Sequence, residues 1–307
     1  MKLAQEPHAD PMMDTACDNA LAAMARAASL ELTPRQILTT DDLSVRLAPG
    51  TRVYVPYLPN GHYPDTIAAS RHLLANDLVP VPHFPARALA SRQQADDWLS
   101  QLAEAGVRRL MVIAGDTAKV AGPFADSLAL LNADLFAGRP FGLGVAGHPE
   151  GHPVADESAL RDALRIKRDY AAATGTDMWV VTQFAFEADS FLTWLHENGD
   201  TIAPLPVYFG IAGPTSLRTL LSYAALCGVG VSARALIRHP ETARLLRSWT
   251  PDGLVEALAH YRVEHPLSLF QGLHIFPFGG LKRSTKWLNN LASAGLADND
   301  QRQSGGQ

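Results

Sequence analysis

Eight short apolar runs, each followed by a longer segment with helical period, predict that this chain of 307 residues folds as a single-domain (β/α)8 TIM barrel. Strands that alternate with helices form a parallel sheet, and a closed barrel is the simplest arrangement for eight of them. An open, doubly wound α/β sheet is the alternative. The strands are expected at residues 28–32, 52–57, 79–84, 109–114, 141–146, 178–183, 205–211 and 272–277.

The predicted barrel occupies residues 28–297, and we find no linker or internal repeat that would divide the chain. Residues 1–27 are expected to be an N-terminal extension with a helix. Residues 298–307 are polar and contain glycine, which predicts a disordered tail. Residues 237–265 look purely helical, and this pattern predicts extra helices before the last strand.

Capping and stop signals locate several of the helices between the strands. Ser91 begins a segment with the form of a capping box, and Gly106 can end the helix that follows it. Asn198 and Gly199 are expected to stop another helix. Further helices are predicted at residues 156–173 and 187–198 and, after Pro214, along an apolar stripe that ends before Gly228.

The composition is that of an ordinary globular protein, with 47% hydrophobic residues and a formal net charge of −5. This mild acidity argues against non-specific nucleic-acid binding, which depends on clustered lysines and arginines. No apolar run approaches the ~20 residues of a membrane span, and the polar N-terminus lacks the pattern of a signal peptide. Cys17 and Cys227 stand in neither a metal nor a redox spacing. We therefore expect a cytoplasmic protein without nucleic-acid or membrane partners, and a homo-oligomer is compatible with the fold.

Glu31 is the first candidate for chemistry, because it is a carboxylate within an apolar strand. Leu30 and Leu32 occupy one face of the run, so Ser29 and Glu31 take the other face, which points into the lumen near the strand's carboxyl end. Loss of solvation there should raise the pKa of Glu31 and suit it to act as an acid. The alternative is a structural carboxylate that pairs with Arg35 or another cation in the lumen.

Asp116 and Gln183 follow or end two further strands, so they are expected at the same rim of the barrel. Gly115 precedes Asp116 and allows the backbone to turn sharply or to approach a ligand closely. Asp116 could instead cap the next helix. The amide of Gln183 can donate and accept hydrogen bonds at once, and its alternative role is a hydrogen bond to a neighbouring loop.

Other motifs in the sequence carry less information. The segment from His148 to His152 resembles a metal-ligand cluster, but it lacks helical i, i+4 geometry and is bracketed by prolines, so we expect no metal site. Gly142 and Gly144 lie inside a strand rather than opening a helix, which makes a dinucleotide fingerprint a poor interpretation. Spacing alone therefore predicts an enzyme-like mouth with an acid, a second carboxylate and an amide, but no particular reaction.

Several segments, in this order along the chain, resemble the methylenetetrahydrofolate reductase family. Residues 113–116 are similar to its Leu-Arg-Gly-Asp strand end, residues 145–153 to its Ala-Tyr-Pro-Glu-x-His-Pro, and residues 182–187 to its Thr-Gln-Phe-Phe-Phe-Asp. Residues 29–35 and 81–84 look like its first strand and its Pro-His-Leu segment. The similarity extends from about residue 29 to residue 276, which is nearly the whole chain.

This resemblance implies an FAD-containing barrel that interconverts 5,10-methylenetetrahydrofolate and 5-methyltetrahydrofolate with NADH or NADPH as co-substrate. Glu31 would be the general acid that protonates N10 of the folate. Asp116 would stabilise the cation that develops near the flavin and pterin. Gln183 would hydrogen-bond the pterin or the nicotinamide. Tetrahydrofolate derivatives would be the binding partners.

By the same resemblance, a further set of residues would form the flavin and substrate sites. Leu217 and Phe276, with Gln183, would contact the substrate, and Phe124 and Ala125 would lie near the other end of the flavin. The cofactor-binding set is Tyr57, His83, Ala114, Gly115, Asp116, His148, His152, Lys167 and Arg168.

The sequence departs from the family pattern at several of these positions. Ala114 replaces an arginine that the family offers to an FAD phosphate, and a lost hydrogen bond to a charged group costs about 1.5–3 kcal/mol. His148 replaces a tyrosine of the flavin site. Leu217 lies where the family often has a phenylalanine. The segment that begins at Phe276 replaces a last-strand segment that ends in Asn-Arg, and Lys282 or Arg283 are candidate substitutes for its arginine. These departures suggest a specialised member that runs the reaction oxidatively.

Two alternatives are a flavin-free folate-binding barrel that acts as a methyltransferase and a non-catalytic folate- or partner-binding protein. The methyltransferase would need no redox cofactor, and the absence of a Cys/His zinc cluster in the sequence counts against it. Retention of Glu31, Asp116 and Gln183 together argues against a mere scaffold. Colour distinguishes these readings, because an FAD protein is yellow as purified.

Overall fold

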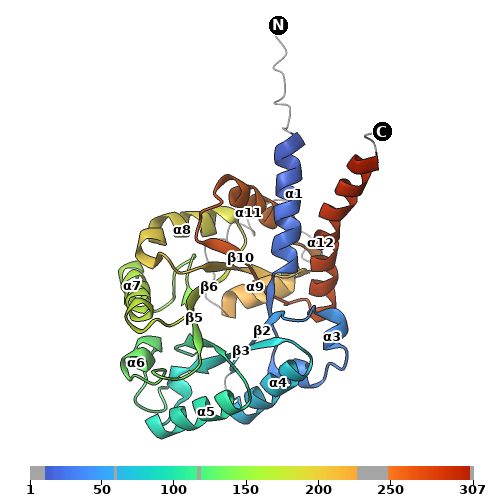
Figure 1. Cartoon of the computed structure of the whole chain (residues 1–307). Coiled ribbons are helices and arrows are strands. Elements are labelled where there is room, and N and C mark those ends of the chain that lie inside the picture. The colour runs from blue at the N-terminus through green and yellow to red at the C-terminus, as the bar shows by residue number, and fades with distance from the viewer. Residues whose placement is uncertain (1–10, 59–60, 116–118, 227–247, 305–307) are drawn as a thin grey trace.

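The computed structural model describes residues 11–58, 61–115, 119–226 and 248–304, and its core is a closed parallel barrel (Figure 1). The strands follow the order β1-β10-β7-β6-β5-β4-β3-β2 around the ring. All eight predicted strands are present, and closure of the ring excludes the open doubly wound sheet. Their bounds are β1 Ser29–Glu31, β2 Arg52–Val55, β3 Val79–Pro85, β4 Arg109–Ile113, β5 Gly142–Gly147, β6 Met178–Ala185, β7 Val207–Ala212 and β10 Phe270–Phe276.

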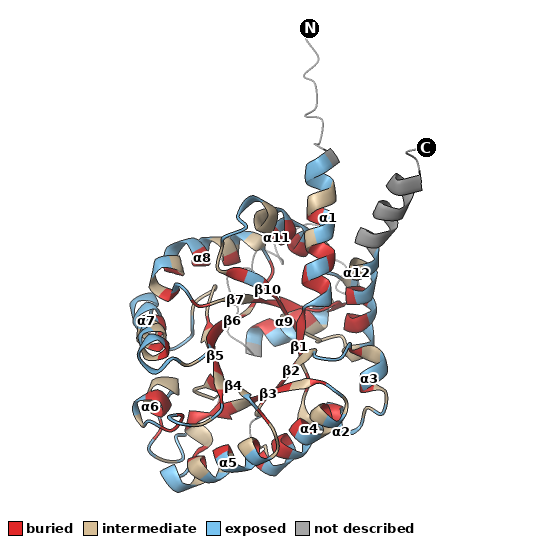
Figure 2. Ribbon diagram, viewed as in Figure 1, coloured by how far each residue is buried: buried red, intermediate tan, exposed pale blue. Residues whose placement is uncertain are grey.

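Helices surround the barrel, and their inward faces are buried while their outward faces are exposed (Figure 2). This arrangement is what an amphipathic helix requires when it packs on the outer face of a parallel sheet. The bounds are α1 Pro11–Arg26, α2 Pro34–Leu38, α3 Leu43–Arg46, α4 Tyr63–Ala75, the 3-10 helix η1 Ala86–Ala88, α5 Arg92–Glu104, α6 Ser127–Asn132, α7 Glu157–Thr174, α8 Ala188–Ile202, α9 Leu217–Leu226, α11 Asp252–Glu264 and α12 Leu281–Ser304.

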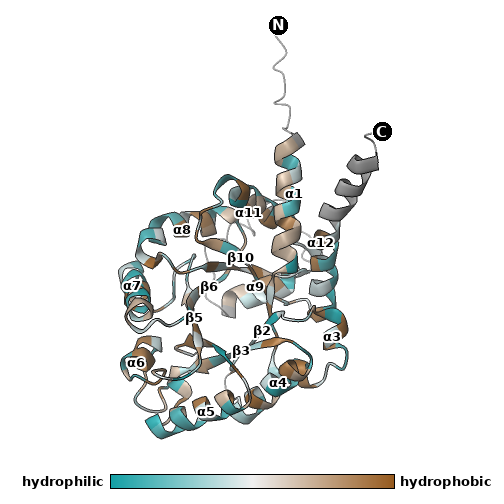
Figure 3. Cartoon of the chain, viewed as in Figure 1, coloured by the Kyte–Doolittle hydropathy of each residue, from teal (hydrophilic) through white to brown (hydrophobic). Residues whose placement is uncertain are grey.

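Side chains alternate along the strands between the helix layer and the lumen. Val180 packs in the main core beneath the helices, whereas Trp179 and Val181 belong to a second cluster inside the barrel. Trp179 donates a hydrogen bond from Nε1 to the hydroxyl of Tyr54 across the lumen at 2.8 Å. Apolar residues are concentrated on the strands and the inward helix faces (Figure 3), so the lumen is a packed core and not a pore.

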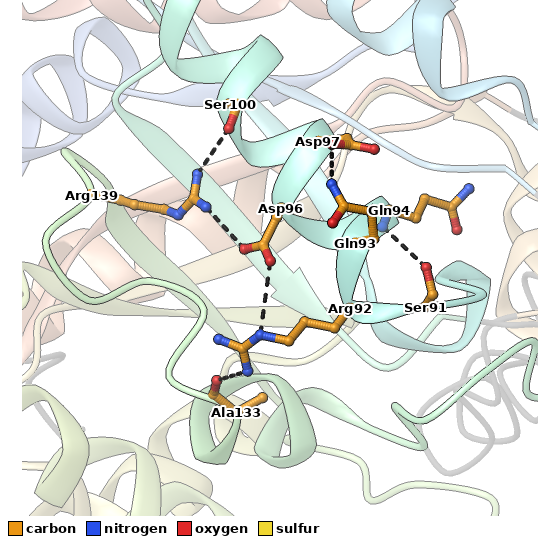
Figure 4. Close-up of polar contacts among 9 residues, drawn as sticks. All are labelled: Ser91, Arg92, Gln93, Gln94, Asp96, Asp97, Ser100, Ala133 and Arg139. Atoms are coloured by element: carbon orange, nitrogen blue, oxygen red, sulfur yellow. Dashed lines mark hydrogen bonds and ion pairs between the residues drawn. The ribbon is translucent and has the colours of Figure 1, made fainter.

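Local signals in the sequence explain how α5 begins and how it is held. Ser91 caps the helix by accepting a hydrogen bond from the backbone N–H of Gln94 at 3.1 Å, as predicted. The side chain of Gln94 accepts from Ala90 rather than from Ser91, so only half of the capping box forms. Figure 4 shows that Asp96 pairs with both Arg92 and Arg139, which ties α5 to the segment after α6.

Two helix boundaries differ from the sequence prediction. Asn198 and Gly199 do not stop α8, which continues to Ile202, because Asn198 donates its side-chain N–H to the carbonyl oxygen of Trp194 within the helix at 2.9 Å. At the other end of the chain, α12 continues to Ser304, into the segment for which the sequence predicted a disordered tail.

The segment before the last strand is not purely helical, so that prediction is wrong in part. Ser248–Trp249 form a short strand, β9, that pairs antiparallel with β8, Thr215–Ser216. Trp249 of this strand packs against the buried cluster that contains Leu217 at the start of α9. The helix α11 confirms the prediction for its own residues, while residues 237–247 and Cys227 lie outside the described part of the chain.

The N-terminal extension forms α1, which lies beside α12 (Figure 1). Arg26 in α1 donates to the carbonyl oxygen of Ala292 in α12 at 2.9 Å. Cys17 is buried against α11, where its sulfur lies 3.1 Å from Nδ1 of His260. Among the described residues, no helix is long and apolar enough to cross a membrane.

We predict that Phe209→Ala strongly destabilises the barrel. Phe209 is fully buried, and its ring stacks on Phe191 at 4.6 Å and on Phe270 at 4.5 Å. Removal of such a side chain should lower the free energy of unfolding by about 3–5 kcal/mol. Urea denaturation checks this, with Leu267→Ala as the control, because Leu267 is 97% exposed and its loss should change stability by less than about 0.5 kcal/mol. Equal stability of the two variants would contradict the packing described.

Candidate active site

Glu31 lies beside a histidine at the carboxyl end of β1. Its Oε2 atom is 3.3 Å from Nε2 of His83, which comes from β3, and both side chains are largely buried. The partner is therefore His83 and not Arg35, the cation that the sequence offered as one alternative. Because parallel strands end at the same rim, residues 52 positions apart in sequence meet here. A carboxylate and an imidazole in contact form an acid–base pair that can hold and pass on one proton.

A second histidine, on the strand that pairs with the other side of β1, acts on Glu31 electrostatically. His274 on β10 is in register with Ser29 on β1, and Nδ1 of His274 lies 3.0 Å from the hydroxyl oxygen of Ser29. The His274 ring also packs edge-on against Tyr54 at 4.4 Å. Burial lowers the pKa of His274 to about 4, although the charge of Glu31 opposes this shift, so the ring is neutral at neutral pH.

The electrostatics correct the sequence prediction for Glu31. Burial raises its pKa, as expected, but the hydrogen bond and charge of His83 and the charge of His274 act in the opposite direction. Together the two histidines outweigh burial, so the pKa of Glu31 lies below its ordinary value. The predicted rise was wrong because it treated the carboxylate as isolated. Glu31 is therefore ionised at neutral pH.

Gln183 lies near the end of β6, two residues before Ala185, and its buried amide oxygen has no hydrogen-bond partner among the described residues. Its Oε1 atom is one of two such side-chain atoms among the described residues. The β6–β7 register shifts between Val181 and Phe184, and a bulge of this kind re-aims the side chains that it contains. An added Cβ at Gly210 would lie 2.3 Å from the carbonyl oxygen of Thr182, so glycine is required for the close approach of the two strands. An unpaired buried acceptor costs about 1–3 kcal/mol, and a donor from water or from a ligand would remove this cost.

The end of β4 is described only in part. Asp116 lies outside the described residues, so its predicted role stays a prediction. Gly115 has a φ of +91°, and a Cβ there would lie 3.3 Å from Cβ of Pro85, which explains the need for glycine. The carbonyl oxygen of Ala114 accepts a hydrogen bond from the backbone N–H of Arg87 at 2.9 Å.

His148, His152 and Lys167 come together beyond the end of β5. The two imidazole rings are 5.1 Å apart and perpendicular, and Nδ1 of His152 accepts hydrogen bonds from the backbone of Val154 and Ala155. Burial, aided by the charges of Lys167 and His152, lowers the pKa of His148 to about 3. Burial also lowers the pKa of Lys167 to about 8, against the charge of Asp126.

Arg168 and Tyr57, which the resemblance assigned to the flavin site, form hydrogen bonds within the protein. Consecutive residues of a helix are about 100° apart around its axis, so Lys167 and Arg168 cannot share one face of α7. The guanidinium of Arg168 instead bonds the carboxylate of Asp169 at 2.6 Å and lies 3.5 Å from the carbonyl oxygen of Asp200 on α8. The hydroxyl of Tyr57 donates to the carbonyl oxygen of Gly61 at 2.8 Å.

Aromatic and aliphatic side chains line the part of the rim where β6, β10 and α9 meet. Leu217 is buried at the start of α9 in one cluster with Phe184, and Phe276 at the end of β10 packs against it. Phe276 stacks on Phe278 at 5.8 Å, and Phe278 stacks on Tyr223 at 4.0 Å. The charge of Lys282, one candidate substitute for the family arginine, acts on Asp42 near α3.

The described residues fit an FAD molecule. Lys167 is only 6% exposed and forms no ion pair within the described part of the chain, so its ammonium group suits a phosphate. Gln183 offers an unpaired amide oxygen to an N–H group of a flavin or pterin ring. The left-handed Gly115 permits a ring to approach the backbone. For metals the described residues contain no group of three or more His, Cys, Asp or Glu side chains that could hold an ion.

Two residues, His274 and Arg87, were not predicted from the sequence, although the structure places them near the candidate site residues. His274 stands at a lumen-facing position of the last strand, and the alternation of apolar and polar residues there was a signal that could have identified it. Arg87 follows β3 directly, and no periodic pattern marks it. Arg87 hydrogen-bonds the loop after β4, at Ala114, Ala121 and Ala125. Contacts of this kind join segments that are separate in sequence, so the pattern of a single strand cannot predict them.

The fold and the site define a closed (β/α)8 barrel protein with a carboxylate–histidine pair and an unpaired amide oxygen at its rim. A family model described as methylenetetrahydrofolate reductase matches residues 65–241, which is more than half of the chain. The chain therefore belongs to the methylenetetrahydrofolate reductase family.

Two curated relatives are plant proteins. The chain is 26% identical to "Probable methylenetetrahydrofolate reductase (NADH)" of Oryza sativa subsp. japonica and 27% identical to "Methylenetetrahydrofolate reductase (NADH) 1" of Arabidopsis thaliana, each over 157 residues. Each alignment covers 46% of this chain and 26% of the relative, so the chain spans about a quarter of the length of these relatives.

A solved structure shares the fold over most of its length. It is an uncharacterized protein from Clostridium thermocellum that binds two copies of 5-methyl-5,6,7,8-tetrahydrofolic acid. The TM-score is 0.60 at 10% sequence identity, and the match covers 89% of this chain and 98% of that one. At this identity the likeness supports the barrel fold.

We predict that His83→Gln raises the pKa of Glu31, because the substitution removes the charge of His83 while burial remains. Carbon NMR titration of protein labelled at the glutamate carboxyl groups measures this pKa. His62→Gln is the matched control, because the His62 side chain is 73% exposed and pairs with Asp65 rather than with Glu31. An unchanged titration of Glu31 in His83→Gln would show that the pair does not set its ionisation.

Proposed function

We propose that this protein interconverts 5,10-methylenetetrahydrofolate and 5-methyltetrahydrofolate, with FAD as cofactor and NADH or NADPH as co-substrate. Membership of the family supports folate one-carbon chemistry. The main structural support for this reaction at the barrel rim is the Glu31–His83 pair, which lies at the same rim as the unpaired amide oxygen of Gln183. A folate needs both, because its pterin ring carries N–H donors and its N10 must gain or lose a proton.

Gln183 would bind and orient the pterin. A buried acceptor that has no partner gains a full hydrogen bond when a donor arrives, without first breaking another one. Leu217 and Phe276 would contact the apolar faces of the substrate from the neighbouring aromatic cluster. These contacts would exclude water from the rings and fix their orientation relative to Glu31.

Glu31 and His83 would handle the proton at N10. In the reducing direction a proton reaches N10, the bond between N10 and the methylene carbon breaks, and the electron pair goes to N10, which leaves a cationic iminium at N5. The flavin supplies the hydride chemistry that reduces this carbon when it is bound. Because Glu31 is ionised at neutral pH, the proton for this step would come from the pair through His83.

The ionised state of Glu31 also suits the reverse, oxidative step. When the methyl group of 5-methyltetrahydrofolate is oxidised, N10 closes on the iminium carbon and loses its proton, and an ionised carboxylate is ready to accept it. Asp116 would stabilise the iminium cation by its negative charge. The departures from the family pattern at Ala114, at His148 and in the last strand are the reason to propose a specialised oxidative member.

A flavin-free folate-binding barrel is the second candidate. The observation that favours it is Ala114, which has no charge to offer to a cofactor phosphate where the family has arginine. Such a protein would act as a methyltransferase or as a binding protein. Its purified form would be colourless and would bind a reduced folate without any flavin absorption.

The proposal predicts that Glu31→Gln retains the reaction with NADH but loses the reaction with folate. Glutamine keeps the size of the side chain but cannot take part in the proton exchange of the Glu31–His83 pair with N10, and loss of a general acid or base slows a step by about 100- to 10,000-fold. Anaerobic stopped-flow absorption separates the two halves: flavin bleaching by NADH and its return on addition of 5,10-methylenetetrahydrofolate.

The control for this experiment is Glu104→Gln, which removes an exposed carboxylate at the end of α5. It should match the wild-type protein in both halves. If Glu31→Gln returned the flavin absorption as fast as wild type, the assignment of Glu31 would be wrong. If the wild-type protein bound no FAD, the flavin-free candidate would replace the proposal.

A further inference from the structure

Arg87 lies beside the position where the family arginine is missing. It belongs to η1, directly after β3, and its backbone N–H donates to the carbonyl oxygen of Ala114 at 2.9 Å. Its own carbonyl oxygen accepts from the backbone N–H of Ala121 at 2.9 Å. The loop after β4 is thus bonded to Arg87 on either side of the undescribed residues 116–118.

The guanidinium group of Arg87 is turned toward the same loop and keeps most of its donors available. Its Nε donates to the carbonyl oxygen of Ala125 at 2.8 Å, and within the described part of the chain this is its one hydrogen bond. It forms no ion pair with a described residue. By contrast, Arg92 and Arg139 are both committed to Asp96 (Figure 4). A planar guanidinium with free terminal nitrogens matches two phosphate oxygens at once.

Packing holds Arg87 in this place. An added Cβ at Gly122 would lie 2.3 Å from the carbonyl oxygen of Ala90, so the loop after β4 rests directly on the segment between η1 and α5. Ser91 caps α5 immediately after this segment, and the Asp96 pairs anchor α5 to its neighbour. A charge that is fixed before binding loses less conformational entropy when it meets an anion.

A second cation approaches the same loop from α7. Lys167 is buried and has no ion pair among the described residues, and its electrostatic partner is Asp126, which follows Ala125. The carboxylate of Asp126 accepts a hydrogen bond from Ala129 as the cap of α6. Asp126 offsets part of the charge of Lys167, so a dianion at this loop needs a further cation, and Arg87 is placed to supply it.

We propose that Arg87, together with Lys167, binds the diphosphate of a dinucleotide at the barrel rim and replaces the charge that Ala114 lacks. The dinucleotide is FAD or NAD(P)H, both of which carry the same diphosphate. The inference rests on the proposed function only in requiring that one of these two molecules binds at the rim. It makes Arg87 a specificity-determining residue that favours dinucleotides over ligands without a diphosphate.

The test measures binding of FAD, riboflavin and NADH by fluorescence titration to the wild-type protein, Arg87→Gln and Arg71→Gln. Arg71 is an exposed arginine of α4 and serves as the control for loss of one positive charge. We expect Arg87→Gln to weaken the binding of its dinucleotide by about 10- to 100-fold, as for loss of a charged hydrogen bond. Binding of riboflavin, which has no phosphate, should not change, and that result would also show that the variant is folded.

The same titrations distinguish FAD from NADH as the source of the bound diphosphate. Weaker FAD binding with unchanged NADH binding assigns the site to the flavin, and the reverse assigns it to the nicotinamide cofactor. Introducing Ala114→Arg into Arg87→Gln should restore much of the lost affinity, because it returns a guanidinium to the same loop.

Two outcomes overturn the inference while the proposed function stands. One is unchanged binding of both dinucleotides to Arg87→Gln, and the other is an equal loss for riboflavin and FAD, which would mean that the phosphates are not what Arg87 contacts. If the wild-type protein bound neither FAD nor NADH, the proposed function and the inference would fail together, so the wild-type titration tells the two failures apart.

Discussion

Closure of eight parallel strands into one ring sends the carboxyl end of every strand to the same rim, and the candidate site depends on this constraint. Glu31 from β1, His83 from β3 and His274 from β10 interact there although they are distant in sequence. Gln183 on β6 lies at the same rim, where a register shift between Val181 and Phe184 changes the direction of the side chains. The outer faces of the strands supply the apolar packing that keeps this ring rigid, so the polar groups are held in position before any ligand binds.

The electrostatic balance at Glu31 decides which chemistry the rim favours. Burial alone would raise the pKa of Glu31, but His83 and His274 oppose burial and leave the pKa of the carboxylate below its ordinary value. Such a pair can both deliver a proton to N10 and accept one from it. The departures from the family pattern are what suggest an oxidative role, and the proposed contact with Arg87 would hold a dinucleotide without the family arginine.

The strands, the closed architecture and the lumen-facing position of Glu31 could be predicted from the sequence, because apolar periodicity is a local property. The partner of Glu31 and the sign of its pKa shift could not, since His83 arrives from another strand and the shift depends on which group it meets. Lys167 and Arg168 are adjacent in sequence, yet helix geometry turns them to different surroundings. The end of α8 was missed because Asn198 bonds within its own helix instead of ending it. Asp116 stays a prediction.

The most direct measurement of the central claim is a crystal structure of the protein with 5-methyltetrahydrofolate. The account predicts that the pterin lies at the rim with one of its N–H groups donating to Oε1 of Gln183 at about 2.7–3.2 Å, and with N10 facing the carboxylate of Glu31. A pterin bound elsewhere on the barrel, or a Gln183 whose amide oxygen is bonded to protein while the ligand is present, would contradict the account.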